Sequence, residues 1–290
     1  MRIDEILKTK RTLSFEVFPP KKEGEEKEKL LRTIDSITEL KPDFISVTYG
    51  AGGSNSRNTA EIAEYIQKKA HVSALAHITG GTSTPEKAEA LARDLRERGI
   101  ENVLCLRGDR PLDDDGTYAK YFPHATDLAE FLTPYGFTLG AACYPEGHSE
   151  CASLYDDLVN MKKKEECGAK FFISQLFYDN TYYYRLVNEA RRIGITSPII
   201  PGIMPITSPK SIHTIKEMCG SAIPLNFRNM IEIYSSHPAV MEEIGLNYAV
   251  YQITDLIAMG APGVHLYIMN NARTARAICA RLEKVINELF

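Results

Sequence analysis

The sequence predicts a (β/α)8 TIM barrel, an α/β fold in which eight parallel strands alternate with helices. Short apolar runs that are typical of buried strands recur roughly every thirty residues, and segments with helical periodicity lie between them. Near-continuous apolar strands indicate a parallel sheet that is covered on its outer side. Eight such units in 290 residues indicate that the sheet closes into a barrel.

The expected strands follow one another along the whole chain. They are LSFEVF from Leu13, FISVTY from Phe44, VSALAHI from Val72, NVLCLRG from Asn102, FTLGAACY from Phe137, KFFISQLF from Lys170, PIIPGIMP from Pro198 and GVHLYIM from Gly263. The long interval before the last strand leaves room for extra helices such as VMEEIGLNYAVYQITDLIAMG. A doubly wound sheet is the rival architecture, but it more commonly has fewer strands and a glycine fingerprint. Since no linker divides the chain, residues 1–290 are expected to form one domain.

The segments between the strands carry recognisable helix boundaries. In TPEKAEALARDLRERG, Thr84 is expected to cap the helix, Pro85 to take its first position and Gly99 to end it. The stretch NTAEIAEYIQKKA repeats the amphipathic pattern. Both segments therefore predict helices that pack one face against the sheet.

Composition is that of an ordinary globular protein, with 44% apolar residues, 25% charged residues and a net charge of −4. No basic block or basic face stands out, which argues against binding to nucleic acid or to a membrane surface. The N-terminus lacks the apolar core of a signal peptide, and no run is long enough to span a membrane, so a cytoplasmic protein is expected. The six cysteines include no C-x-x-C pair and are interpreted as reduced thiols.

Polar residues interrupt the apolar runs at the ends of the expected strands. These residues are Thr48 and Tyr49, His77 and Thr79, Arg107 and Asp109, Tyr144 and His148, Gln175, and Tyr267 and Asn270. Glu16 lies within the first apolar run and can face the same end. Functional residues of a barrel collect where its strands end, so this clustering predicts an active site there.

Each of these features also has a simpler structural interpretation. The GAGG of residues 50–53 can be a tight turn, because no G-x-G-x-x-G follows a strand. His77 can be a hydrogen-bonded core histidine, Asp109 can cap a turn, and MKKKEE from Met161 can be a solvated helix face. No histidine spacing typical of a metal site and no G-x-S-x-G elbow occurs, so neither a metal nor acyl transfer is expected.

Taken together, seven stretches resemble, in the same order, the motifs of the methylenetetrahydrofolate reductase family. They are FEVFPPK, SVTYGAGGS, AHITG, LRGD, YPEGH, GAKFFISQLFYD and IIPGIMPI. The resemblance covers nearly the whole chain and is to the bacterial form that consists of the catalytic domain only. It implies a barrel that holds FAD at its mouth. It also implies that NAD(P)H reduces FAD, which then reduces 5,10-methylenetetrahydrofolate to 5-methyltetrahydrofolate, a step of one-carbon metabolism and methionine biosynthesis.

The resemblance also assigns roles to individual positions. Glu16 matches the general acid. Asp109 matches a position beside the flavin, where an ionised carboxylate would stabilise a cationic substrate and disfavour a negative reduced flavin. The positions that match FAD contacts are Thr48, Tyr49, Ala51, His77, Arg107, Gly108, Asp109, Ala125, Tyr144, His148, Asp157, Asn160, Lys163 and Lys164. The positions assigned to substrate binding are Asp109, Gln175, Tyr184 and Asn271. Asn271 stands where the family commonly has an arginine that binds the folate tail, and Arg273 follows two residues later.

The proposed chemistry explains why Glu16 stands in an apolar strand. Opening the methylene bridge of the substrate requires a protonated nitrogen, so the site needs an acid that still holds its proton near neutral pH. The apolar neighbours Phe15, Val17 and Phe18 should disfavour the ionised carboxylate by desolvation.

Two other functions are compatible with the same fold. A phosphate-binding aldolase or lyase would need a Schiff-base lysine or metal ligands at strand ends, and the sequence offers neither. A non-catalytic flavin- or folate-binding subunit of a larger methyl-transfer complex would not need Glu16, Asp109 and Gln175 together. The expected partners are NAD(P)H and methylenetetrahydrofolate, together with further copies of the chain or a partner subunit.

Overall fold

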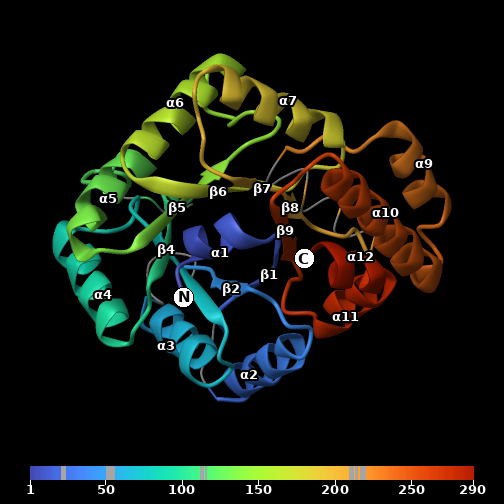
Figure 1. The fold of residues 1–290 in the computed structure, drawn as a ribbon, viewed down its shortest axis with the longest axis horizontal. Coiled ribbons are helices and arrows are strands. Elements are labelled where there is room, and N and C mark those ends of the chain that lie inside the picture. Colours follow the sequence, from blue (N-terminus) through green and yellow to red (C-terminus); the bar gives the residue numbers. More distant parts are fainter. Residues whose placement is uncertain are drawn as a thin grey trace.

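The computed structural model describes residues 1–20, 24–49, 56–111, 114, 116–208, 212, 215 and 220–290. Its nine strands form one parallel sheet in the order β7-β6-β5-β4-β3-β2-β1-β9-β8. Seen end-on in Figure 1, the strands form a ring and the helices surround it.

Strands and helices alternate along most of the chain. The strands are β1 (Thr12–Val17), β2 (Phe44–Val47), β3 (Ser73–Thr79), β4 (Asn102–Leu106), β5 (Thr138–Cys143), β6 (Ala169–Ser174), β7 (Ile199–Ile200), β8 (Gly202–Ile203) and β9 (Gly263–Tyr267). The helices are α1 (Ile3–Thr9), α2 (Glu25–Thr38), α3 (Ser56–Lys68), α4 (Pro85–Glu97), α5 (Ala125–Leu132), the 3-10 helix η2 (Thr133–Tyr135), α6 (Leu154–Glu166), α7 (Asn180–Arg192), α9 (Leu225–Ile233), α10 (Pro238–Ala258), α11 (Ala272–Arg281) and α12 (Glu283–Leu289).

The seventh expected strand is divided into β7 and β8, with Pro201 between them. β7 pairs with β6, whereas β8 pairs with β9. Proline has no N–H to donate to a ladder, but the Pro201 carbonyl accepts a hydrogen bond of 3.0 Å from the His265 N–H. The two short strands therefore share one place in the ring and join β6 to β9. The predicted (β/α)8 barrel is confirmed.

The expected helix boundaries and the extra helices are also present. The Thr84 hydroxyl accepts a hydrogen bond from the Lys87 N–H at the start of α4, and Pro85 takes the first helical position. Gly99 follows the helix with a left-handed φ of +82°, which glycine adopts at little cost. Helices α9 and α10 fill the long interval before β9.

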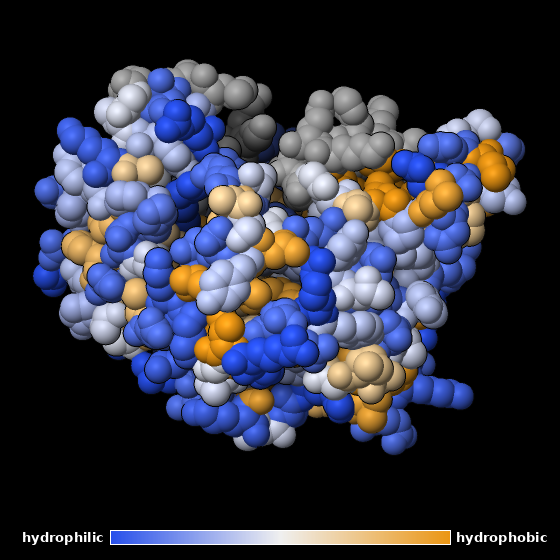
Figure 2. All heavy atoms as spheres, turned by 90° about the horizontal axis from the view of Figure 1, so that it is seen from above, coloured by the Kyte–Doolittle hydropathy of each residue, from blue (hydrophilic) through white to orange (hydrophobic). Residues whose placement is uncertain are grey.

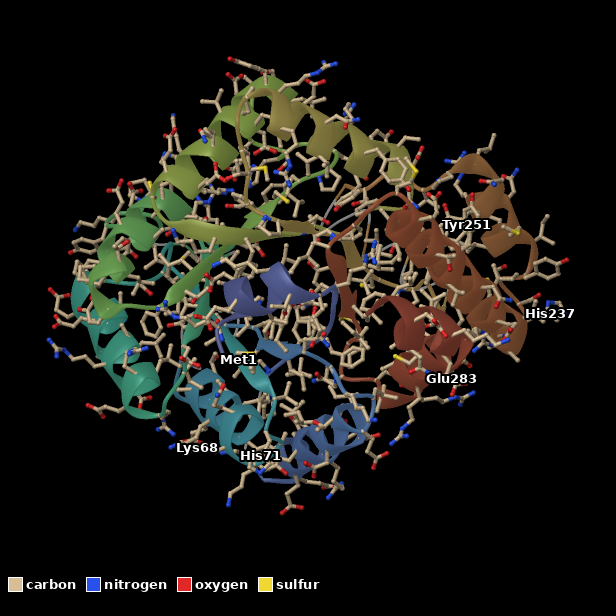
Figure 3. The ribbon with its side chains drawn as sticks, viewed as in Figure 1. Met1, Lys68, His71, His237, Tyr251 and Glu283 are labelled. Carbon is tan, nitrogen blue, oxygen red and sulfur yellow. The ribbon has the colours of Figure 1, made fainter. Side chains whose placement is uncertain are left out.

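Helix α1 closes the amino end of the barrel, a feature that the sequence did not predict. The Ile3 N–H donates to Asn102 Oδ1 at 2.9 Å, and the Thr138 hydroxyl donates to Asp4 Oδ1 at 3.1 Å. Asn102 and Thr138 begin β4 and β5. In Figure 3, Met1 lies inside the ring, whereas Lys68 and His237 lie on its outer side. The carboxyl mouth, where the strands end, is therefore the end that can admit a ligand.

Apolar side chains fill the barrel interior and the layer between the strands and the helices. The interior cluster joins α1 to five strands and consists of Ile3, Phe44, Leu75, Leu104, Phe171, Ile173 and Ile200. A larger cluster packs the outer faces of the strands against the helices. Burial of this surface is the main favourable term in folding.

The surface carries exposed apolar residues around α9. Leu225 and Ile233 are 62% and 69% exposed, and Figure 2 shows apolar surface on the side where α9 lies.

No helix within the described ranges is sufficiently long and apolar to cross a membrane. The described cysteines Cys105, Cys143, Cys151, Cys167 and Cys279 are all free thiols, whereas Cys219 lies outside the described residues.

Candidate active site

Glu16 is buried in the barrel interior near the carboxyl mouth, with only 6% of its surface exposed. It is the penultimate residue of β1 and pairs in register with Ser46 on β2 and Tyr267 on β9. The Ser46 hydroxyl donates a hydrogen bond of 3.4 Å to Glu16 Oε2. The predicted buried carboxyl is therefore confirmed, and it has polar neighbours rather than a purely apolar surrounding.

His77 faces the same carboxyl from β3, with its Nε2 atom 3.6 Å from Glu16 Oε2. Burial lowers the pKa of His77 to about 4, a shift that Glu16 opposes and His265 increases. His77 is therefore neutral at neutral pH. Its Nε2 atom has no hydrogen-bond partner among the described residues, although buried polar atoms usually have one. A ligand in the mouth could supply that partner.

His265 completes this interior cluster from β9, and the sequence reasoning missed it. Its Nε2 atom lies 3.8 Å from Glu16 Oε2 and 3.4 Å from Ser46 Oγ. Its Nδ1 atom lies 2.8 Å from Ser14 Oγ. Ser14, Ser46 and His265 are all fully buried. Because side chains of a strand alternate between its faces, the spacing of Ser14 and Glu16 on β1 and of His265 and Tyr267 on β9 could have revealed the cluster.

A second cluster lies between the end of β5 and helix α6. The rings of Tyr144 and His148 meet edge to face with centroids 4.7 Å apart. The His148 N–H donates to Asp157 Oδ2 at 3.1 Å, and Lys164 Nζ lies 5.6 Å from the Tyr144 ring centroid. Lys164 also donates to the Ala142 carbonyl at 2.9 Å. Burial lowers the pKa of Lys164, and the Asp157 carboxylate opposes this shift. Four residues that were assigned to the cofactor therefore lie close together, namely Tyr144, His148, Asp157 and Lys164.

The loop after β4 joins this cluster through an ion pair. Arg107 binds Glu150 in a bidentate contact with N–O distances of 2.6 and 2.8 Å, and the Glu150 N–H donates to His148 Nδ1 at 3.1 Å. Gly108 has φ of +84°, and a Cβ atom there would lie 3.0 Å from Thr79. Asp109 follows with an exposed side chain. The RGD turn therefore presents a carboxylate at the rim of the mouth.

The remaining residues assigned to the cofactor lie at the mouth or on nearby helices. Thr48 and Tyr49 directly follow β2. Ala125 is the first residue of α5. On α6, Asn160 Nδ2 lies 3.7 Å from Cys151 Sγ, whereas Lys163 is exposed. Ala51 lies outside the described residues. Lys164 rather than Lys163 is thus the lysine that α6 directs toward the strands.

The residues assigned to the substrate are more widely separated. Gln175 follows β6, and its Oε1 atom accepts a hydrogen bond of 2.9 Å from the Leu176 N–H. Tyr184 is a residue of α7, and its hydroxyl donates to Asp255 Oδ2 of α10 at 2.5 Å. It lines an open hollow of about 770 Å³ along the outer face of α7. Tyr184 therefore lies on a helix rather than at a strand end.

Two asparagines after β9 have structural partners. Asn271 caps α11, because its Oδ1 atom accepts hydrogen bonds from the N–H groups of Arg273 and Thr274 at 3.1 and 3.3 Å. Asn270 binds both backbone groups of Phe18 at 2.9 Å, which ties the ends of β9 and β1 together. Arg273 is exposed and lies 3.3 Å from Glu242. The Asn271 side chain thus has a structural task at the place assigned to the folate tail.

A smaller, mostly apolar hollow lies beside the second cluster. It has a volume of about 220 Å³ and is bordered by Tyr144 and Pro145 of the loop after β5 and by side chains of α6 and α7. Asp157, Tyr155 and Leu158 contribute from α6. Polar groups of the mouth and an apolar recess therefore adjoin each other.

Comparison with known proteins agrees with the resemblance seen in the sequence. The family model described as methylenetetrahydrofolate reductase matches residues 2–283. The 5,10-methylenetetrahydrofolate reductase of Escherichia coli (strain K12) is 33% identical over 271 residues, which cover 93% of this chain and 90% of that protein. Methylenetetrahydrofolate reductase (NADH) 1 of Arabidopsis thaliana is 34% identical over 283 residues. That match covers 93% of this chain but 48% of the plant protein, so the chain spans about half the length of its plant relatives.

Solved structures show the same architecture. A protein from Clostridium thermocellum, described as binding two copies of 5-methyl-5,6,7,8-tetrahydrofolic acid, matches with a TM-score of 0.67 and 18% identity. The match covers 98% of this chain and 100% of that one. At this identity the likeness concerns the fold alone.

Proposed function

Because the chain belongs to the methylenetetrahydrofolate reductase family, we propose that it reduces 5,10-methylenetetrahydrofolate to 5-methyltetrahydrofolate, with FAD as cofactor and NAD(P)H as electron donor. The observation that carries the proposal is the position of Glu16. It is a buried carboxyl near the open end of a barrel, and it has a serine and two histidines around one oxygen. This arrangement suits a group that holds a proton for a bound substrate.

The residues around the mouth fit FAD. Arg107 and Lys164 are cations beside the loops that follow β4 and β5, and phosphate groups bind such side chains. His77 offers a buried nitrogen without a hydrogen-bond partner among the described residues. The apolar hollow beside Tyr144 is suited to an aromatic ring. When bound, FAD supplies hydride transfer between the nicotinamide and the folate.

The side chains of the chain itself perform the remaining tasks. Glu16 donates a proton to a nitrogen of the methylene bridge, so that one C–N bond can open to an iminium cation. The Asp109 carboxylate at the rim stabilises that cation electrostatically. Gln175 Oε1 accepts a hydrogen bond from the N–H of the neighbouring Leu176, and its amide group can turn from there toward a ligand in the mouth. Helix α1 keeps water from entering through the amino end.

We further infer that the protein works in the cytoplasm, in one-carbon metabolism and methionine biosynthesis, as a homo-oligomer or with a partner subunit. The plant relatives that are named for NADH support NADH as the donor. Reduction by NADH and by NADPH at equal concentrations compares the two donors directly.

The absorption spectrum of the purified protein tests the proposal. We expect a yellow preparation with an absorption band at about 450 nm. In the absence of oxygen, NADH or NADPH should bleach this band and methylenetetrahydrofolate should restore it. Protein that takes up no flavin after incubation with FAD would contradict the assignment of the cofactor. A flavin band that the folate does not restore would contradict the assignment of the substrate.

Lys164→Met should weaken FAD binding by about 10- to 100-fold, because an apolar side chain of similar length would replace a partly desolvated cation that is assigned to hold the phosphate part of FAD. Equilibrium dialysis of the apoprotein with FAD measures this effect. Lys162→Met on the same helix is the matched control, since Lys162 Nζ binds Glu165 and the Gly194 carbonyl instead. Equal FAD affinity in the Lys164 variant and the wild type would remove Lys164 from the cofactor site.

Asn271→Arg should make the protein less stable but improve its binding of the folate. It removes the cap of α11 and should lower the free energy of unfolding by about 1 kcal/mol, measured by urea denaturation. It also restores the cation that the family commonly has there, so the KM for the folate should fall. Asn271→Ser keeps a capping side chain without adding a charge and is the control. If the folate KM does not fall with Asn271→Arg, while Arg273→Ala raises it, Arg273 already binds the folate tail.

A further inference from the structure

The segment between β6 and α7 is held by side chains at four successive backbone carbonyls. Residues 175–179 form neither strand nor helix. The carbonyls of residues 175–178 accept hydrogen bonds, in this order, from Ser174 Oγ at 2.9 Å, Ser221 Oγ at 3.0 Å, Gln252 Nε2 at 2.8 Å and the Tyr248 hydroxyl at 2.5 Å. Buried backbone groups of an irregular segment need such partners, because no ladder or helix supplies them. Together the four hydrogen bonds form a clamp on the segment.

Two of the clamping side chains come from one face of α10. Tyr248 and Gln252 are four residues apart, so they project from the same side of the helix. The Tyr248 ring stacks on Phe227 of α9 with centroids 3.7 Å apart and an interplanar angle of 2°. Gln252 is only 2% exposed. The extra helices α9 and α10, which precede β9 (Figure 1), therefore hold both donors in place.

The chemistry of the groups determines the direction of these two hydrogen bonds. A carbonyl can only accept, so the Gln252 amide presents its Nε2 atom and the Tyr248 hydroxyl donates. Burial raises the pKa of Tyr248 to about 12, so the hydroxyl keeps its proton at neutral pH. Gln252 Oε1 is buried and has no hydrogen-bond partner among the described residues. Burying an amide in this way is costly, which favours a functional role for it.

Gln175 combines a fixed backbone with a side chain that can move. Its backbone N–H donates to the Cys143 carbonyl at 2.8 Å, which continues the contact between β6 and β5. Its Oε1 atom accepts from the N–H of the next residue, Leu176, at 2.9 Å. A ligand can replace that local contact while the four carbonyl contacts stay in place. The amide can therefore turn toward the mouth without a movement of the backbone that carries it.

We propose that Tyr248 and Gln252 position Gln175 for the substrate by clamping the backbone that follows it. This inference rests on the proposed function, in which Gln175 binds the substrate. The polar ends of Tyr248 and Gln252 bind backbone carbonyls, so both act through Gln175 and are positioning residues. A displacement of about 1 Å in a substrate-binding group can slow a reaction by about 10²-fold, so the clamp should affect the rate.

Tyr248→Phe and Gln252→Met each remove one hydrogen bond of the clamp and keep most of the side-chain volume. In the FAD-loaded protein, each change should slow the flavin-to-folate step by about tenfold or more. In a Gln175→Ala background, the same changes should alter the rate by less than about twofold, because the residue through which they act is gone. Equal losses in both backgrounds, or no loss in either, would overturn the inference.

Two matched controls separate positioning from stability. Tyr251→Phe removes a hydroxyl from the same helix, but Tyr251 is 69% exposed and lies outside the ring of strands in Figure 3. Gln67→Met removes a glutamine of α3 that also binds backbone, since its Oε1 atom accepts from the Ala74 N–H at 3.0 Å near the start of β3. Gln67→Met should lower the free energy of unfolding, measured by urea denaturation. Neither control should change the folate step.

Hydrogen exchange measured by mass spectrometry gives a second readout that needs neither FAD nor folate. The amide hydrogens of residues 176–179 should exchange about tenfold faster in Tyr248→Phe and Gln252→Met, and at the wild-type rate in Gln67→Met. Unchanged exchange in the first two variants would overturn the clamp. Faster exchange in a protein whose wild type reduces no folate would refute the proposed function and support the clamp alone.

Discussion

Replacing Glu16 with glutamine should slow reduction of methylenetetrahydrofolate by about 10²–10⁴-fold, the usual contribution of a general acid. Glutamine keeps the size and polarity of the side chain but has no proton to donate to the methylene bridge. Reduction of the flavin by NAD(P)H needs no proton from this residue and should stay within a few-fold of the wild-type rate. Stopped-flow spectroscopy measures the two half-reactions separately through bleaching and recovery of the flavin band.

The control for this change is Glu89→Gln, which removes a carboxylate from the outer face of α4, where Glu89 pairs with Arg93. Both half-reactions should be unaffected there. Equal losses in the two half-reactions of Glu16→Gln would make Glu16 a structural or FAD-positioning residue. No loss in either would place the acid elsewhere.

Replacing Asp109 with asparagine should raise the reduction potential of bound FAD and slow folate reduction by at least about tenfold. The change removes a negative charge at the rim of the mouth while keeping the shape of the side chain. Without that charge, the negative reduced form of FAD becomes more stable relative to the oxidised form, and the iminium cation of the substrate becomes less stable. Hydride transfer from the flavin to the substrate should therefore be slower. Spectroelectrochemical titration measures the potential, and FAD should remain bound.

Asp94→Asn is the matched control, because Asp94 lies on α4 and pairs with Arg98 away from the mouth. Its flavin potential should equal that of the wild type. If Asp109→Asn also left the potential unchanged, Asp109 would act as a turn residue or as an uncharged folate contact.

The order and position of the strands could be predicted because each strand buries both of its faces and therefore reads as an apolar run. The observed strands begin at or within one residue of the predicted ones. The seventh is the exception in detail, since Pro201 interrupts the ladder and divides the run PIIPGIMP into β7 and β8. Helix α1 was not predicted, because its seven residues carry too short a pattern to show which surface they cover.

The position of Glu16 could be predicted from the sequence because a carboxyl is rare in an apolar strand. The cluster behind it could not, since Ser14, Ser46 and His265 each look ordinary in their own strand. They become a network only when β1, β2 and β9 lie side by side, which is long-range information. Asn271 shows the opposite difficulty. The resemblance to the family assigned Asn271 to substrate binding, whereas the structure shows that its side chain caps α11.

The most direct test of the central claim is a single anaerobic turnover of the wild-type protein. The flavin is first reduced with one equivalent of NAD(P)H, and one equivalent of methylenetetrahydrofolate is then added while absorbance and folate products are followed together. We predict that the flavin band recovers fully and that one 5-methyltetrahydrofolate forms per flavin. A recovered band without 5-methyltetrahydrofolate, or a reduced flavin that the folate leaves unchanged, would contradict the account.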